Sequence, residues 1–247
     1  MKYPLLSALF LLLAFSAALP VHSATSIMGP TGVINSPSPE TLEKGFLESG
    51  LHFRRYTFGS FNGSGSQYSF KANFGVAQNC EAGFEKTLDT GSYLEDPGIT
   101  VNGKIAYTLG ENLSFAAGVL LDSDTNDYSS AYFVFGAPVA FFGFGFNFGG
   151  HQNTFNHAQF GGYDFEDGQP DQAFFLAGAE FKVNQAAFTI GYNGDYVSMG
   201  IRAPLESEQM TVDVGWTSES DYVDYFRQVK NPNYDQHRYI VGLSATF

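Results

Sequence analysis

The chain has 247 residues and a formal net charge of −13; only 15% of its residues are charged, while 17% are aromatic and 28 are glycine. The acidic balance disfavours binding to nucleic acid and to anionic surfaces. The single cysteine, Cys80, excludes an intrachain disulfide and a metal site built from several cysteines, and no cofactor is indicated. Abundant aromatic residues and glycine at near-neutral mean hydropathy favour an outer-membrane β-barrel over a helical membrane protein.

The first residues have the pattern of a secretory signal peptide. Lys2 gives a short basic start, residues 5–18 form an apolar run, and a small-residue cleavage pattern ends at Ser23. We therefore predict that residues 1–23 are removed, with cleavage after Ser23 or Ala24. A membrane anchor is the alternative, although the apolar run is short for a bilayer span.

Residues 24–45 precede the first predicted strand and are expected to form a periplasmic N-terminal segment. Ser38 and Pro39 suit the cap and the first position of a helix, and Gly45 is placed to end a single helical turn. Two arrangements are open for this segment: a flexible periplasmic leader, and an ordered plug or cap of a barrel.

The rest of the chain contains strands in which apolar residues alternate with small or polar ones. In FFGFGFNFGG, residues 141–150, phenylalanine occupies every second position from Phe142 to Phe148. This two-residue period indicates β-strands, each near the ~9–11 residues that a tilted strand needs to cross a bilayer. A short additional strand could lie in AQFGGYDF, residues 158–165. Twelve strands are predicted, at 46–56, 67–76, 80–88, 99–109, 112–121, 128–137, 140–149, 172–183, 186–193, 195–203, 208–218 and 236–247.

The connections between these strands alternate in length. If the chain starts in the periplasm, the odd-numbered connections lie outside the cell, and they include the long segments 150–171 and 219–235. The even-numbered ones, such as Ala77-Gln78, are tight. Long outer loops and short periplasmic turns are typical of outer-membrane barrels. The sequence therefore predicts that residues 46–247 form an all-β, single antiparallel transmembrane barrel of the bacterial outer membrane.

The two faces of the strands differ in chemistry. We expect the aromatic face to contact lipid, and the face rich in glycine, serine and threonine to fill a narrow lumen. A soluble periplasmic barrel or sandwich is the alternative, but glycines such as Gly143 would make a poor solvent-facing surface. Most strand charges fall on the inner face, where five of each sign are candidates to line the lumen and to pair across it: Arg54, Lys71, Lys104, Lys182, Arg202, Glu48, Glu81, Glu85, Glu180 and Asp213.

The final strand ends in an aromatic residue with apolar residues at two-residue steps before it: Tyr239, Val241, Leu243, Ala245 and Phe247. This pattern resembles the C-terminal signal by which outer-membrane barrels are recognised for insertion. It implies the barrel-assembly machinery as a partner, together with outer-membrane lipid and lipopolysaccharide. A plain amphipathic final strand is the alternative.

The N-terminal segment also resembles a known group. Thr31, Gly32, Val33, Ser36 and Pro37, followed by an acidic residue and a glycine before a strand, are similar to the YjbH-like outer-membrane proteins of exopolysaccharide clusters. The stretches YFVFGAP, FGGYDF, AGAEF and GYNGDYVSMGIR also look like strands of that group. The resemblance implies an outer-membrane barrel linked to producing or exporting extracellular polysaccharide, with polysaccharide export components as partners. This chain differs in being short and in lacking a lipoprotein cysteine.

Catalysis and metal binding are not indicated. Ser129 and Ser130 have no histidine at strand spacing, as a phospholipase-type barrel would need. His151 and His157 have no carboxylate at ligand spacing.

Two functions from different classes therefore remain. One is a narrow channel, or an accessory component, for the export of extracellular polysaccharide or of small acidic solutes, in which inward basic residues line a wet path. The other is a structural or adhesive surface barrel with a closed lumen and functional extracellular loops. Because inward charges of both signs can pair and narrow the lumen, we expect a pore of low conductance at most.

Overall fold

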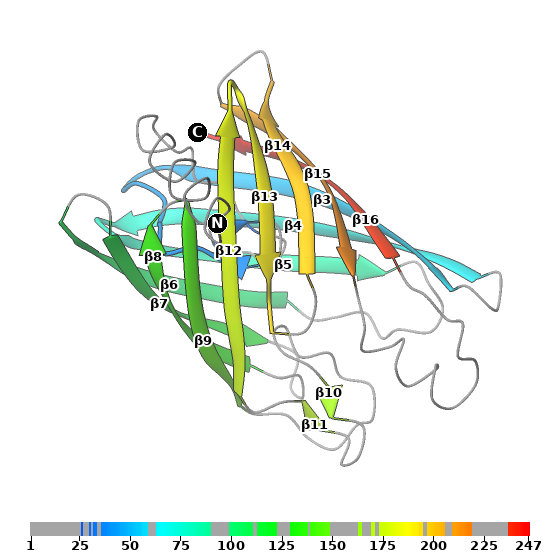
Figure 1. Ribbon diagram of the computed structural model, residues 1–247, viewed down its shortest axis with the longest axis horizontal. Coiled ribbons are helices and arrows are strands. Elements are labelled where there is room, and N and C mark those ends of the chain that lie inside the picture. Colours follow the sequence, from blue (N-terminus) through cyan, green and yellow to red (C-terminus); the bar gives the residue numbers. More distant parts are fainter. Residues whose placement is uncertain are drawn as a thin grey trace, which may run out of the picture.

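A closed antiparallel barrel dominates the structure (Figure 1). The computed structural model describes residues 26, 30, 32–33, 36–58, 63–89, 99–110, 113–122, 129–137, 139–148, 163–164, 169–170, 173–194, 197–205, 209–218 and 237–247. Within these residues, twelve strands form the barrel, so the predicted fold and strand count are confirmed. The strands are β3 (Leu47–Phe58), β4 (Gly63–Ala77), β5 (Cys80–Asp89), β6 (Ile99–Leu109), β7 (Leu113–Asp122), β8 (Ser129–Ala137), β9 (Ala140–Phe148), β12 (Ala173–Val183), β13 (Ala186–Tyr192), β14 (Val197–Pro204), β15 (Met210–Ser218) and β16 (His237–Thr246).

Strands adjacent in the chain are adjacent in the barrel, and two further pairings complete it. β9 pairs with β12, and β16 pairs with β3 to close the ring. At this junction the main chains of Leu47 and Phe247 exchange two hydrogen bonds, of 3.0 and 2.8 Å. The C-terminal residue therefore helps to close the barrel.

Two pairs of two-residue strands lie apart from the barrel sheet. In the N-terminal segment, β1 (Gly32–Val33) pairs with β2 (Ser36–Pro37). After β9, β10 (Tyr163–Asp164) pairs with β11 (Gln169–Pro170). β10 falls inside residues 158–165, where the sequence allows a short extra strand, but it does not join the barrel.

The predicted signal peptide, residues 1–23, and the alternative of a membrane anchor both lie outside the described residues. In the part of the chain that is described, no helix is both long enough and apolar enough to cross a membrane.

β3 and β4 are longer than the apolar alternation predicts. The predicted strands end at residue 56 and begin at residue 67, whereas the observed pairing continues to Phe58 and Gly63. The residues that extend β4 are only glycine and serine, so they carry no apolar period. The hydrogen bonds between paired strands are made by backbone groups. The pairing can therefore continue beyond the residues whose side chains alternate between apolar and polar.

Tight turns join the strands at one end of the barrel, which we call the short-turn end. Asn79 and Asn184 adopt positive φ angles of 59° and 57° in the turns after β4 and β12, and Gly110 has φ of 71° after β6. Asparagine and glycine are the residues that tolerate this conformation, so the turns are encoded locally.

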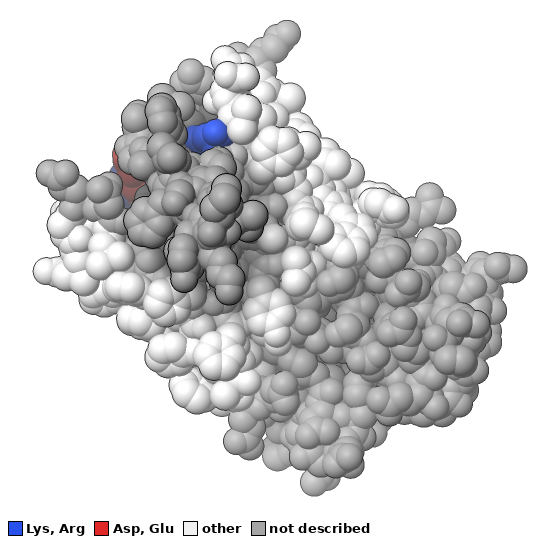
Figure 2. Space-filling view, viewed as in Figure 1, with Lys and Arg blue, Asp and Glu red and all other residues white. Residues whose placement is uncertain are grey.

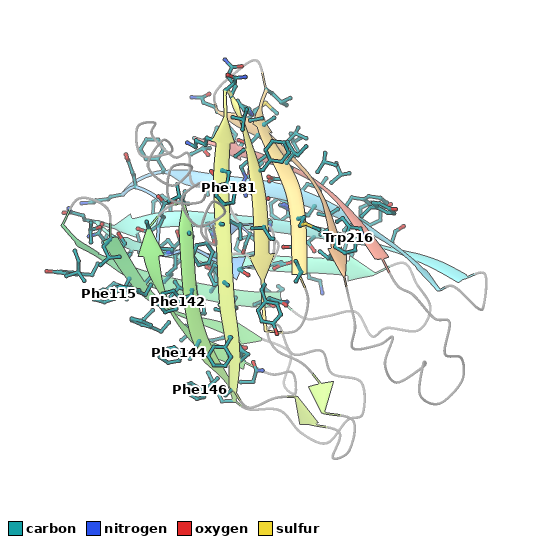
Figure 3. All side chains as sticks on the ribbon, in the orientation of Figure 1. Phe115, Phe142, Phe144, Phe146, Phe181 and Trp216 are labelled. Atoms are coloured by element: carbon teal, nitrogen blue, oxygen red, sulfur yellow. The ribbon has the colours of Figure 1, made fainter. Side chains whose placement is uncertain are left out.

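The outer surface of the barrel is apolar. Phe142 and Phe175 are 62% and 74% exposed, and the described part of the face in Figure 2 is almost free of charge. Figure 3 shows Phe142, Phe144 and Phe146 pointing away from the barrel along β9. Rings on adjacent strands contact each other, with 5.7 Å between the centroids of Phe133 and Phe144. A continuous surface of this kind is stable against lipid and unstable against water, as in outer-membrane barrels.

Glycines on the inner face make room for rings from the neighbouring strand. Gly118 of β7 lies opposite Tyr132 of β8, and Gly145 of β9 lies opposite Phe174 of β12. A Cβ atom added at either glycine would overlap the facing ring. The alternation of phenylalanine and glycine in β9 therefore has two causes: phenylalanine faces lipid, and glycine seats side chains that fill the lumen.

Candidate functional site

Most of the described residues of the N-terminal segment are buried against the inner face of the barrel. We call the described residues of this segment between 26 and 45 the plug segment. Ser26, Val33, Ser36 and Leu42 are all buried, and β1 and β2 both contact β12 of the wall. Ser36 Oγ donates a hydrogen bond of 2.8 Å to the carbonyl oxygen of Tyr192. Of the two arrangements that the sequence leaves open, the described residues adopt the ordered plug.

Wall side chains hold the plug segment by its main chain. The three donors are basic side chains, and the three acceptors are backbone carbonyl oxygens. Such contacts fix the path of the backbone and do not depend on which side chains the segment carries. The pairs are Lys71 of β4 with Ser26, Lys104 of β6 with Ser38 at 3.3 Å, and Arg202 of β14 with Gly32 at 3.2 Å.

The anchors lie on opposite sides of the lumen. In the closed ring of twelve strands, β6 and β14 are six strands apart. Lys104 and Arg202 therefore tie the plug segment to diametrically opposed parts of the wall. The segment spans the lumen rather than lying along one side of it.

Arg202 is the centre of a buried cluster. Its Nε donates to Asp213 Oδ1 at 2.8 Å, its Nη1 donates to Glu180 Oε2 at 3.2 Å, and its Nη2 binds the plug segment. All three side chains are at most 7% exposed. Arginine suits this role because its planar guanidinium directs several donors to fixed partners.

A second buried pair holds the other end of the plug segment. Lys104 Nζ lies 3.0 Å from Glu81 Oε1, and neither side chain is exposed. The other oxygen of Glu81 accepts a hydrogen bond of 2.9 Å from the amide nitrogen of Leu42. The ion pair thus binds a carbonyl of Ser38 through its cation and an amide of Leu42 through its anion.

The single helical turn predicted from Ser38 to Gly45 is wrong. These residues are all described and form no helix. The Ser38 hydroxyl does accept a hydrogen bond from the Glu40 amide, at 3.3 Å. However, the Ser38 carbonyl and the Leu42 amide form hydrogen bonds with wall side chains. In an α-helix these two groups would be hydrogen-bonded to each other. Tertiary partners have replaced the helical hydrogen bond.

Part of the inner surface of the barrel is apolar. Val33 of the plug segment belongs to a buried cluster with side chains from β7, β8, β9 and β12. The wall residues of this cluster are Ala116, Leu120, Tyr132, Val134, Phe141, Phe174 and Leu176. The plug segment therefore contacts both charged and apolar parts of the inner surface.

Most of the side chains predicted to line the lumen lie inside the barrel. The Lys182 side chain is half-buried, and the Arg54 side chain lies outside what the structure describes. The others are buried: Glu48, Lys71, Glu81, Glu85, Lys104, Glu180, Arg202 and Asp213.

The residues of the two terminal patterns lie in different surroundings. Tyr239, Val241, Leu243 and Phe247 are exposed on the outer surface, whereas Ala245 is half-buried. Of the N-terminal pattern, Gly32, Val33, Ser36 and Pro37 form β1 and β2, and Thr31 lies outside the described residues.

The residues considered for catalysis and metal binding do not form a site in the described structure. Ser130 Oγ donates to Asn147 Oδ1 at 2.6 Å, as a buried polar pair between β8 and β9. Among the described residues, no group of three or more histidine, cysteine, aspartate or glutamate side chains is placed to hold a metal ion. His151 and His157 lie outside those residues.

Comparisons with known proteins identify barrels of the outer membrane. No family model and no curated protein sequence matches the chain. Outer membrane phospholipase A from Escherichia coli is similar in structure: an active-site mutant is 10% identical, with 84% of this chain and 93% of that chain covered and a TM-score of 0.43. Ail, the attachment invasion locus protein of Yersinia pestis, is 6% identical, with 83% and 99% covered and a TM-score of 0.25. Neither similarity is strong enough to transfer an activity to this chain.

Proposed function

We propose that this outer-membrane barrel is a narrow conduit that its own N-terminal segment closes at rest, and that solute passes only when the segment leaves the lumen. The observation that carries the proposal is the anchoring of the plug segment across the lumen, by Lys104 on β6 and Arg202 on β14. A segment tied to opposite walls blocks the path between them.

The polar character of the anchors favours a plug that can leave. Apolar residues of similar volume often stabilise a protein interior as well as buried ion pairs do. A lumen that is closed permanently would therefore not need buried charged residues to fill it. A hydrogen bond from a charged donor to a backbone carbonyl contributes about 1.5–3 kcal/mol net, because release exchanges it for a hydrogen bond to water. The three anchors therefore hold the segment through contacts that water can replace.

The proposed solute is an extracellular polysaccharide or a small acidic solute, and polysaccharide export components are the proposed partners. The resemblance of the N-terminal motif to the YjbH-like pattern supports this choice; the motif consists of Thr31, Gly32, Val33, Ser36 and Pro37. So does the chemistry of the lumen, because release of the plug would free donors on Lys71, Lys104 and Arg202 for sugar oxygens.

A structural surface barrel with a permanently closed lumen is the second candidate. The packing of Val33 in the buried apolar cluster favours it, since Leu120 and Val134 of that cluster are fully buried. In that case the function would reside in the extracellular loops.

Single-channel recording in planar bilayers tests the proposal. The refolded protein should show rare openings of low conductance, and Gly32→Ala should raise the open probability about tenfold or more. A Cβ atom at residue 32 would overlap the Ser36 carbonyl across the β1–β2 pair, and overpacking of this kind costs about 1–3 kcal/mol.

Gly50→Ala is the matched control, because Gly50 also faces inward but an added Cβ would meet its neighbours at 3.5 Å, an ordinary distance. Its open probability should equal that of the unmodified protein. A wide channel that stays open in the unmodified protein would contradict the plug, and silence in all three proteins would favour the structural barrel.

A further inference from the structure

We propose that the lumen is a peptide-binding site and that the plug segment is its tethered ligand. The site therefore also accepts the sequence of this segment when a separate chain presents it, as a second copy of the protein could. This inference rests on the proposed function, because it states the class of ligand that the closed lumen binds.

The strand pairing of the barrel is complete without the plug segment. The ring of twelve strands closes through β16 and β3. Within the described residues, β1 and β2 pair with each other and form a separate two-stranded sheet. The segment precedes β3, so its C-terminal end is the end that joins the wall. The segment is therefore placed as a ligand held by one tether, and not as a part of the barrel sheet.

The wall binds the main chain of the segment both as a donor and as an acceptor. Lys104 Nζ donates to the carbonyl oxygen of Ser38 at 3.3 Å. Its ion-pair partner, Glu81, accepts from the amide nitrogen of Leu42 at 2.9 Å. Arg202 donates to a further carbonyl oxygen of the segment, at 3.2 Å. A peptide presents carbonyl acceptors and amide donors along one chain, so this set of wall groups suits a peptide ligand.

Four positions of the segment set the side chains that the site requires. A Cβ atom at Gly32 would lie 2.1 Å from the Ser36 carbonyl oxygen. Val33 and Leu42 are apolar and 3% exposed, and the Ser36 hydroxyl donates to the Tyr192 carbonyl oxygen. A peptide ligand therefore needs a glycine with an apolar residue directly after it, then a serine and a second apolar residue at the positions equivalent to 36 and 42.

The tethered segment competes with an added peptide for this site. An added peptide binds only to molecules whose own segment has left the lumen, so its apparent affinity is reduced in proportion to that fraction. Gly32→Ala weakens docking of the protein's own segment, because the new Cβ atom would overlap the Ser36 carbonyl. The change leaves the wall unaltered. The variant should therefore bind an added peptide more tightly than the parent does.

Fluorescence anisotropy of a labelled peptide of residues 24–45 measures this binding. The peptide contains one lysine, Lys44, which is exposed in the docked segment and can carry the dye. Full-length Gly32→Ala, refolded in detergent micelles, should bind the peptide about tenfold more tightly than the parent, or more. Full-length Gly50→Ala is the control and should bind the peptide as weakly as the parent, since its added Cβ atom meets its neighbours at an ordinary distance.

Two variants of the peptide test the required side chains. Val33→Asp would place a carboxylate in the buried apolar cluster, and should lower the affinity of the peptide for the Gly32→Ala protein by about tenfold or more. Glu43→Gln changes a position that is exposed in the docked segment, and this peptide should bind as tightly as the unmodified one.

The outcomes separate this inference from the proposed function. Equal affinity of the parent and Gly32→Ala for the peptide would place the bound peptide outside the lumen and would overturn the inference. Equal affinity of the Val33→Asp peptide and the unmodified peptide would also overturn it. If Gly32→Ala opened more often in bilayers but bound no peptide, the inference would fail and the plug would stand. If it neither opened more often nor bound the peptide, both would fail.

Discussion

Replacing Arg202 by methionine should destabilise the folded barrel by about 3–5 kcal/mol, because the change removes one member of a buried charge cluster and leaves its partners unpaired. Asp213 and Glu180 both bind this guanidinium, and both are buried. The free energy of unfolding, measured by urea titration of the protein in lipid vesicles, should fall by this amount. The Gly32 carbonyl would also lose its donor, so the plug should open more often.

The matched control removes the partners together with the arginine. In the triple variant Arg202→Met, Asp213→Asn, Glu180→Gln, no buried charge of the cluster remains, and most of the lost stability should return. If Arg202→Met alone were as stable as the parent, the buried cluster would not exist as described.

Replacing Phe144 by arginine should prevent most of the chain from assembling in the membrane. Phe144 lies near the middle of β9 and is 48% exposed on the outer surface. A basic residue facing lipid at the bilayer midplane costs about 2–4 kcal/mol. The yield of folded protein, read from its shifted migration in unheated gel electrophoresis, should fall accordingly.

Phe144→Leu is the control, since it keeps an apolar side chain toward lipid and loses only the ring contacts with Phe133 and Phe146. It should assemble with a yield close to that of the parent. Equal assembly of the arginine variant would mean that this face of β9 does not contact lipid.

The barrel could be predicted closely because lipid imposes a strict pattern on every strand. A residue on the outer face must be apolar, so apolar residues recur at every second position in each membrane-crossing strand. β6 is observed at the residues predicted for it, 99–109. Only where strands leave the apolar layer, as at Gly63, does the pattern stop before the pairing does.

The inward glycines could be predicted only in part. Their small size indicates a crowded lumen. The structure shows that a Cβ atom at Gly145 would overlap the Phe174 ring and would lie 2.6 Å from the Ala131 carbonyl. The register between β9 and β12 creates this constraint, and register is a long-range property that one strand does not encode.

The docking of the plug segment could not be predicted from the residues alone. Its contacts join residues far apart in the chain: Gly32 meets Arg202, and Ser38 meets Lys104. The wall binds mainly backbone groups, which every sequence possesses, so few side chains of the segment reveal its position.

Hydrogen exchange at Leu42 tests the central claim, that the N-terminal segment is docked inside the barrel. The amide of Leu42 donates to Glu81 in the lumen, and the side chain of Leu42 is buried. In the folded protein this amide should exchange at least about a hundredfold more slowly than in an isolated peptide of residues 24–45. Exchange of Leu42 at the rate of the isolated peptide would contradict the plugged barrel.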